Sequence, residues 1–147
     1  MISGRLEMSE GIVTCEVEIE VPFFDVDLME IVWHGHYLKY FEVARCALLD
    51  KIGYNYMQMR ASGYTWPVID LRIRYVRPTK FRQKIIVHAG ISEWENRLKI
   101  NYRIADKLTG TRLTCGYTYQ VAVDIATEEM CYESPAILWE KLGLQKP

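Results

Sequence analysis

One long segment with helical spacing stands in a chain whose other ordered stretches have the pattern of strands. The helical segment covers residues 35–51 and repeats apolar side chains every three or four positions: Tyr37, Tyr40, Phe41, Ala44, Leu48 and Leu49. Strand-like runs, most of them alternating apolar and polar residues, cover residues 13–21, 69–75, 84–91, 98–104 and 113–123. This order predicts an α+β fold, in which an antiparallel sheet of about five strands, four of them in hairpin succession, wraps around the helix.

Shorter elements lie between these segments. Residues 54–61 are predicted to form either a short second helix or an ordered loop, and another short helix begins near Pro135. Residues 77–80 have the composition of a turn or bulge, and residues 106–110 have that of a hairpin turn. The chain contains no internal repeat and no linker, so the elements are expected to share one core.

The size and charge of the chain narrow its class. At 147 residues, two separately cored domains would each fall below the usual size, so residues 1–147 are predicted to form a single domain. Hydrophobic residues make up 50% of the chain, which is enough for a sizeable core. The formal net charge of -1 is too balanced for a dedicated nucleic-acid surface, so no nucleic acid is expected as a partner.

The sequence favours a cytoplasmic protein. Its first residues lack the apolar core of a signal peptide, and no stretch of about 20 apolar residues is available to span a membrane. The four cysteines lie far apart without a Cys-x-x-Cys pair, and they are predicted to be buried, reduced thiols: Cys15, Cys46, Cys115 and Cys131.

The stretch 21–45 carries the candidate chemistry. Asp25 and Asp27 lie in an aromatic and aliphatic loop directly before the long helix. A carboxylate loses hydration in apolar surroundings, which makes it a better base or nucleophile. Free backbone N–H groups at a helix start can stabilise a developing oxyanion. This combination favours acyl transfer.

Three motifs follow one another in an order that resembles a known family. The first motif is Asp25-x-Asp27, three residues, Ile31-Val32-Trp33-His34, two residues, Tyr37, and then Glu42-x-x-Arg45. The other two are Arg74-Tyr75-Val76-Arg77-Pro78 and Val121-Ala122-Val123-Asp124. Together they resemble the hotdog-fold thioesterases of the 4-hydroxybenzoyl-CoA thioesterase and YbgC-like group over nearly the whole chain. The resemblance implies a hotdog fold and hydrolysis of an acyl-CoA or acyl-carrier-protein thioester by water, without a metal or organic cofactor.

The resemblance also implies roles for individual residues. Asp27 matches the catalytic carboxylate, which acts as a general base on water or as a nucleophile on the thioester carbonyl. The backbone N–H of His34 matches the group that polarises this carbonyl, and Asp25 matches a structural position that fixes the loop through backbone N–H groups. Many members have Gly in place of Glu30. A glutamate there either points to solvent or raises the pKa of Asp27 by like-charge repulsion.

Further side chains are candidates for substrate contact: Trp33, Tyr37, Trp66, Arg77, Lys80 and Arg82. Tyr37 and Trp66 could equally belong to the core. The cations of residues 77–82 bind CoA phosphates or an acidic carrier protein, or else form a solvated strand face. Glu42 and Arg45 are spaced for an intrahelical ion pair, and the alternative is a contact with a second subunit. The His-x-His sequence at residues 34–36 lacks further ligands, so no metal site is predicted.

The sequence leaves two other functions possible, and it also predicts that the chain forms an oligomer. A hotdog module without hydrolytic activity would bind an acylated carrier and protect the thioester. A hotdog dehydratase or hydratase needs a paired His and acid in a different motif, which the sequence does not contain. Because one helix cannot cover both edges of the sheet, a homodimer or a dimer of dimers, which is a homotetramer, is expected.

Overall fold

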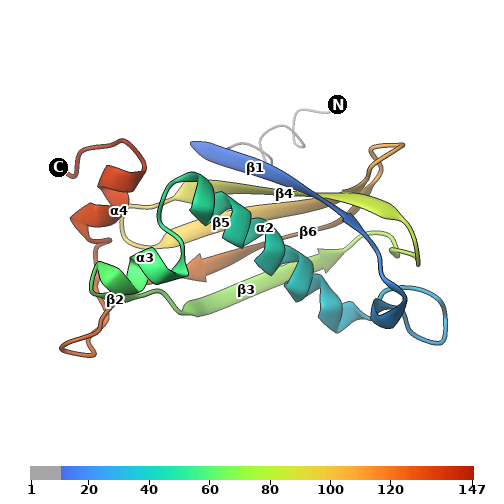
Figure 1. The fold of residues 1–147 in the computed structure, drawn as a ribbon, viewed down its shortest axis with the longest axis horizontal. Coiled ribbons are helices and arrows are strands. Elements are labelled where there is room, and N and C mark those ends of the chain that lie inside the picture. The colour runs from blue at the N-terminus through green and yellow to red at the C-terminus, as the bar shows by residue number, and fades with distance from the viewer. Residues whose placement is uncertain (1–10) are drawn as a thin grey trace.

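The computed structural model describes residues 11–147. Five antiparallel strands form one curved sheet, and helix α2 lies along its inner side (Figure 1). The predicted α+β hotdog architecture, with about five strands around one long helix, is therefore confirmed. The elements in chain order are β1 (Val13–Glu20), the 3₁₀ helices η1 (Phe23–Asp25) and η2 (His34–His36), α2 (Tyr37–Lys51), α3 (Tyr56–Ala61), β2 (Tyr64–Thr65), β3 (Val68–Tyr75), β4 (Lys84–Glu93), β5 (Leu98–Asp106), β6 (Arg112–Gln120), β7 (Val123–Asp124) and α4 (Ala136–Lys141).

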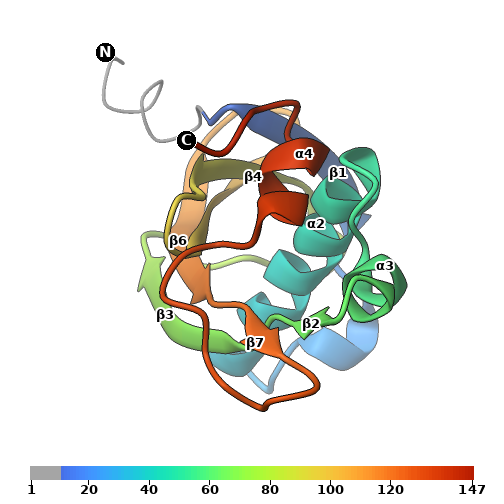
Figure 2. The ribbon, with the colours of Figure 1, turned by 90° about the vertical axis from the view of Figure 1, so that its left-hand side faces the viewer.

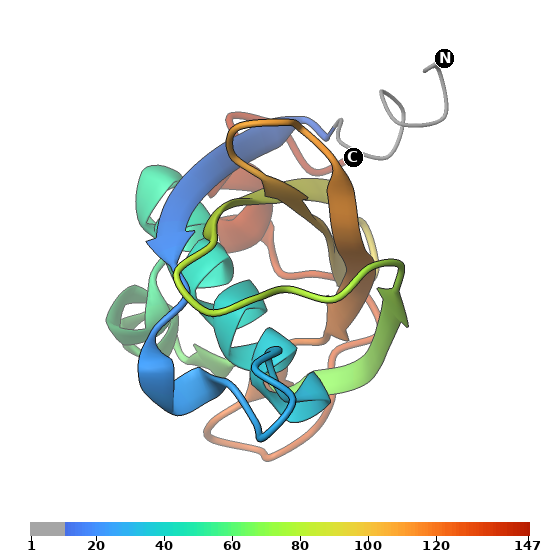
Figure 3. The ribbon, with the colours of Figure 1, turned by 90° about the vertical axis from the view of Figure 1, so that its right-hand side faces the viewer.

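The strand order is β1-β4-β5-β6-β3, so the prediction of hairpin succession is wrong for the first strand after the helix. β3 pairs with β6 at one edge of the sheet, with Tyr75 opposite Thr114. The chain then crosses one end of the sheet through residues 76–83 to reach β4, as the yellow-green segment in Figure 3 shows. Alternation indicates that a strand forms, but it does not encode which distant strand becomes its partner.

The last long strand is shorter than the predicted run 113–123. β6 ends at Gln120, and the next two residues, Val121 and Ala122, are both buried, which breaks the alternation. The chain then pairs Val123 with Thr65 in a small second sheet made of β2 and β7. This small sheet and α4 lie at the end of the molecule opposite residues 21–36 (Figure 2).

The core lies between α2 and the inner face of the sheet. The ring of Phe41 on α2 stacks on the ring of Tyr102 on β5, with centroids 4.3 Å apart and 6° between the ring planes. Gly116 on β6 is required beneath this pair, because a Cβ there would lie 3.0 Å from Phe41 and 2.2 Å from the carbonyl oxygen of Arg72. This packing fixes α2 against the sheet, and with it the loop that precedes the helix.

β3 is an open edge of the sheet. Among residues 11–147 it pairs only with β6, and apolar side chains stay exposed along its length. The exposed fractions are 40% for Val68, 54% for Ile69, 39% for Leu71 and 49% for Tyr75. An exposed apolar edge strand is a surface suited to pairing with another strand.

The cysteines are free thiols, but the prediction that they are buried is wrong, since Cys46 is exposed and Cys15, Cys115 and Cys131 are half-buried. No helix within residues 11–147 has the length and apolarity needed to cross a membrane. The expectation about a signal peptide concerns the first residues, which lie outside the described part of the chain.

Candidate active site

The acidic loop folds as a tight hairpin between β1 and α2. Val26 and Val32 form an antiparallel bridge, and the backbone N–H of Asp27 donates to the carbonyl oxygen of Ile31 at 2.9 Å. The N–H of Glu30 donates to the carbonyl oxygen of Asp27 at 2.9 Å, which closes a four-residue turn. The side chain of Asp27 therefore has a defined position directly before the helix.

The carboxylate of Asp27 is oriented and accessible. Its Oδ1 accepts a hydrogen bond of 2.8 Å from the backbone N–H of Met29, which is an Asx turn, and the residue is exposed. Within residues 11–147 no Lys, Arg or His forms an ion pair with this carboxylate. Its second oxygen therefore stays open to water or substrate.

Glu30 has a backbone conformation that favours glycine. Its φ is 63°, in the left-handed region that residues with a Cβ adopt at a cost. This gives a conformational reason for the Gly that many members of the resembled family have here. The side chain of Glu30 is exposed and is not part of the wall of any cavity that Asp27 lines.

Glu30→Gly is expected to raise the free energy of unfolding by about 1 kcal/mol, because glycine adopts a positive φ without steric strain. Urea denaturation monitored by circular dichroism measures the change. Met29→Gly is the matched control, because Met29 neighbours Glu30 in the turn and its φ is not positive. This control should lower stability, and a loss of stability in Glu30→Gly as well would contradict the account of the turn.

Asp25 anchors the loop to the helix. Its buried carboxylate forms an ion pair with Lys39 Nζ and accepts a hydrogen bond of 2.7 Å from the hydroxyl of Tyr40. The expectation that this side chain binds backbone N–H groups is thus corrected, because both of its partners are side chains of α2. Burial alone raises the pKa of Asp25, but the hydrogen bonds from Lys39 and Tyr40 and the charge of Lys39 outweigh it and hold the pKa below its usual value.

Asp27 and the start of the helix line one cavity of about 310 Å³, together with Tyr37 and Tyr75. The hydroxyl of Tyr75 on β3 donates a hydrogen bond of 2.8 Å to the backbone carbonyl oxygen of His34, which ties the helix start to the sheet. His34 also lines the cavity and begins η2, which leads into α2. N–H groups in the first turn of a helix have no acceptor within the helix. The wall of the cavity thus includes a carboxylate residue, Asp27, and a helix-start residue, His34.

The predicted phosphate-binding cations lie in different places. Arg77 lines the cavity of Asp27 and also a neighbouring cavity of about 370 Å³, which Lys80 lines as well. Pro78 is likewise shared by the two walls, so the cavities adjoin. The guanidinium of Arg82 lies over the ring of Phe81, 5.5 Å from its centroid, and lines neither cavity.

Neither of the two tryptophans predicted to contact substrate, Trp33 and Trp66, lines the Asp27 cavity. Trp33 is 48% exposed, and its ring contacts the rings of His34 and His36, at centroid distances of 4.9 and 5.4 Å. Trp66 is buried, and its indole N–H donates to the hydroxyl of Tyr54 at 3.2 Å. Within residues 11–147 no group of three or more His, Cys, Asp or Glu side chains is placed to hold a metal ion.

Trp66 lines a larger cavity of about 650 Å³ between α2, α3 and the start of β3. Sequence reasoning did not assign Arg45 or Gln120 to a site, yet both line this cavity. The predicted ion pair between Glu42 and Arg45 is present. Gln120 lies at a polar position of the alternation in residues 113–123, which is typical of a solvent-facing side chain, yet it is buried.

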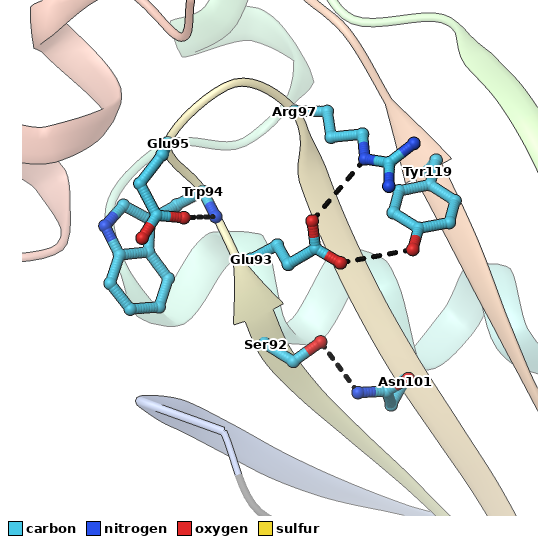
Figure 4. Close-up of polar contacts among 7 residues, drawn as sticks. All are labelled: Ser92, Glu93, Trp94, Glu95, Arg97, Asn101 and Tyr119. Carbon is cyan, nitrogen blue, oxygen red and sulfur yellow. Dashed lines mark hydrogen bonds and ion pairs between the residues drawn. The ribbon is translucent and has the colours of Figure 1, made fainter.

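Another network of polar side chains lies at the turn between β4 and β5 (Figure 4). The carboxylate of Glu93 accepts a hydrogen bond of 3.1 Å from the hydroxyl of Tyr119, and it pairs with Arg97 at 3.5 Å. The guanidinium of Arg97 lies 3.8 Å from the ring centroid of Tyr119. These contacts connect β4 and the β4–β5 turn to β6 at the end of the sheet away from Asp27.

A curved antiparallel sheet around one helix is the hotdog fold, and here a cavity lined by the carboxylate of Asp27 lies at the helix start. Hotdog-fold thioesterases are the class that the sequence motifs resemble. The sequence agrees with this class, since a model of the thioesterase-like superfamily matches residues 21–138. The chain belongs to this superfamily.

Individual relatives show how far the similarity extends. The chain is 38% identical over 77 residues to YneP of Bacillus subtilis, which is named as a candidate acyl-CoA thioesterase; the match covers 52% of this chain and 56% of YneP. It is 29% identical over 128 residues to a candidate esterase of Synechocystis, with 86% of this chain and 77% of that protein covered. A solved DHNA-CoA thioesterase from Staphylococcus aureus has a TM-score of 0.73 and 28% identity, over 81% of this chain and 80% of that one.

Proposed function

We propose that this protein hydrolyses acyl-CoA thioesters at the cavity lined by Asp27. The reaction adds water across the thioester: a C–O bond forms at the acyl carbon, the C–S bond breaks, and free acid and CoA thiol leave. A thioester carbonyl is already electrophilic and the thiolate is a good leaving group. The reaction therefore needs an activated oxygen nucleophile and a donor for the developing oxyanion, and nothing more.

The observation that carries this proposal is the meeting of Asp27 and the start of α2 in one cavity. The open oxygen of Asp27 is available to take a proton from water or to attack the acyl carbon itself. In this proposal the backbone N–H of His34 donates to the carbonyl oxygen of the substrate, where negative charge develops. The names of the relatives, which include acyl-CoA thioesterases, support the same reaction.

Arg77 and Lys80 are proposed to bind the phosphates of CoA. Neither side chain forms an ion pair within residues 11–147, and Arg77 stands where the Asp27 cavity meets the neighbouring one. A CoA arm leaving the thioester along this path would meet both cations. The structure does not bring Arg82 to this path, so it serves as a control.

Neutralising Arg77 and Lys80 together to Ala is expected to raise KM for acyl-CoA by about tenfold with little change in kcat, because these contacts are the same before and during the chemical step. The defect should shrink with rising salt and vanish with acyl-N-acetylcysteamine, which lacks the nucleotide. Arg82→Ala should leave KM nearly unchanged. An unchanged KM in the double variant at low salt would show that CoA is held elsewhere.

We further propose a homodimer in which β3 pairs antiparallel with β3 of a second copy. The exposed apolar side chains of β3 support this pairing. Antiparallel pairing brings the start of one β3, beside Trp66, next to the end of the other, where the partner subunit's Tyr75 lines the partner's cavity. Light scattering should give at least twice the chain mass of 17.2 kDa. A fully active species of 17.2 kDa would contradict the dimer.

A panel of acyl-CoA and acyl-carrier-protein thioesters, followed by release of free thiol, tests the proposed activity. Multiple turnovers on at least one acyl-CoA are expected. Turnover only on acylated carrier protein would show that the substrate is the acylated carrier protein and not acyl-CoA. Binding that protects every thioester from hydrolysis would instead support a module without hydrolytic activity.

A further inference from the structure

Exposed apolar side chains gather at the end of the molecule where the hairpin of residues 26–32 precedes α2. Phe23 and Phe24 in η1 are 74% and 75% exposed, and Leu28 and Met29 at the hairpin tip are also exposed. The half-exposed ring of Phe81 lies edge-on to that of Phe23, with centroids 6.2 Å apart. We call these five residues the end patch. Large apolar side chains exposed together on a folded protein mark an interaction site.

Backbone contacts hold the two segments of the end patch side by side. Ile31 in the hairpin forms an antiparallel bridge with Lys80 in the segment that crosses the end of the sheet. The N–H of Arg82 donates to the carbonyl oxygen of Val21 at 3.1 Å. Both segments, blue and yellow-green, face the viewer in Figure 3. The end patch is therefore presented by one connected backbone frame at one end of the molecule.

The segment that carries Phe81 is strongly basic. Residues 76–84 contain no acidic residue and four cations: Arg77, Lys80, Arg82 and Lys84. None of these cations forms an ion pair within residues 11–147. In residues 21–33 the carboxylate of Asp25 is paired with Lys39, so only Asp27 and Glu30 oppose the four cations. The two segments together thus have an excess of positive charge.

Two cations lie against aromatic rings of the end patch. The guanidinium of Arg82 is 5.5 Å from the ring centroid of Phe81, and Nζ of Lys39 is 5.5 Å from that of Phe24. Arg82 has a φ of 68°, a left-handed conformation that glycine adopts without strain. The chain thus holds a cation beside the patch at a conformational cost, which favours a role for this charge.

We propose that the end patch docks on an anionic lipid bilayer. Its apolar side chains enter the boundary between headgroups and acyl chains, and the neighbouring cations stay at the level of the anionic headgroups. The shape of the patch favours a bilayer over a folded partner. Its four most exposed members project outward, and none of them lines either of the cavities beside Pro78. A fluid apolar phase adapts to separate projections, whereas a folded partner needs a matching hollow for each.

Docking in this orientation brings the cavity of Asp27 to the lipid surface, because both segments contribute to its wall through Ile31 and Arg77. The proposed pairing through β3 leaves Phe23 and Phe24 uncovered. β1 and β3 are opposite edges of the sheet, and η1 lies on the β1 side of α2 (Figure 3). The docking itself does not depend on the proposed hydrolysis.

The test is sedimentation of the protein with vesicles, made of phosphatidylcholine alone or of equal parts phosphatidylcholine and phosphatidylglycerol, without any thioester. The partition coefficient is measured for the wild type, the double variant Phe23→Ser/Phe24→Ser, and Arg82→Gly. Tyr56→Ser/Met57→Ser is the matched control. These two residues are adjacent on α3, are 66% and 70% exposed, and lie at the opposite end of the molecule (Figure 1).

We expect the wild type to bind the mixed vesicles at least about tenfold more strongly than phosphatidylcholine alone, and less strongly as salt rises. The double phenylalanine variant should lower the partition coefficient by about tenfold or more, because it removes two apolar anchors. Arg82→Gly should lower it about fivefold on mixed vesicles only, the effect of one basic residue at an anionic surface. Its free energy of unfolding should not fall, because glycine suits the backbone there. The control should bind like the wild type.

A wild type that binds neither kind of vesicle, or a partition coefficient that the double phenylalanine variant retains, would overturn the proposal. If the wild type ignores vesicles but binds an acidic carrier protein through these phenylalanines, the end patch serves a protein partner instead. If it ignores vesicles and the double variant has a lower mass in light scattering, a second copy covers the patch instead. Vesicle binding is measured without substrate, so its failure leaves the proposed hydrolysis standing, and an absence of turnover leaves the docking standing.

Discussion

Asp27→Asn is expected to lower kcat by about 10²- to 10⁴-fold, the usual cost of losing a general base, while KM changes little. Asparagine has nearly the same shape as aspartate and keeps an oxygen that can accept the hydrogen bond from the N–H of Met29, so the turn should survive. What disappears is the charge on the open oxygen, which removes the proton from water or attacks the acyl carbon. Steady-state assays of thiol release on the best acyl-CoA measure the loss.

Glu30→Gln is the matched control for this result. It neutralises a carboxylate in the same turn, but the side chain of Glu30 does not line the cavity. The control should keep kcat near the wild-type value. Equal losses in both variants would indicate that the charge of the turn, and not Asp27 itself, supports turnover. Near wild-type kcat in Asp27→Asn would place the reaction at another site.

Asp25→Asn is expected to lower the free energy of unfolding at pH 7 by about 2–3 kcal/mol. Removing one member of a buried ion pair typically costs 3–5 kcal/mol. The loss here should be smaller, because 46% of the Lys39 side chain is exposed and its ammonium regains water. Urea denaturation at pH 7 measures the change. Lys99→Met is the control, because it removes a charge from the sheet that forms no ion pair within residues 11–147. It should change the free energy of unfolding by less than about 1 kcal/mol.

The pH dependence of the free energy of unfolding identifies the cause of the stability lost in Asp25→Asn. The pKa of Asp25 is lower in the folded protein than the usual value of an aspartate carboxyl, about 3.9. The stabilisation is therefore fully present above that value and is lost as the pH falls through the lower pKa of the folded state. The difference in stability between wild type and Asp25→Asn should shrink steadily below about pH 4. A difference that stays constant down to pH 2.5 would show that packing, and not charge, is responsible.

The sequence predicts those parts of the fold that depend on local periodicity. The alternation of residues 13–21 and 98–104 identifies β1 and β5, because the apolar face is half-buried in β1 and buried in β5. The spacing in residues 35–51 identifies α2, although its first turn is the 3₁₀ helix η2. The pairing of β3 with β6 could not be predicted, because partner choice depends on the closure of the whole sheet.

The candidate site, like the fold, could be predicted only in those parts that lie within one sequence motif. Asp27 and His34 lie within one motif, and the structure places both in one cavity. Tyr75 belongs to another motif, but its hydrogen bond to His34 spans 41 residues and depends on the position of β3. The partners of Asp25 lie one helix turn into α2, where the sequence shows only an ordinary Lys and Tyr. Gln120 has the parity of the polar residues in the run 113–123, so its burial beside Trp66 is visible only in three dimensions.

The most direct test of the central claim is the fate of water oxygen during turnover. The protein is incubated with an acyl-CoA in ¹⁸O-labelled water under multiple-turnover conditions, and the acid product is analysed by mass spectrometry alongside the free thiol. Hydrolysis at Asp27 predicts one ¹⁸O atom in the carboxyl group for each thiol released, and none of this product from Asp27→Asn above the uncatalysed background. Thiol release without labelled acid, or labelled acid formed equally well by Asp27→Asn, would contradict the account.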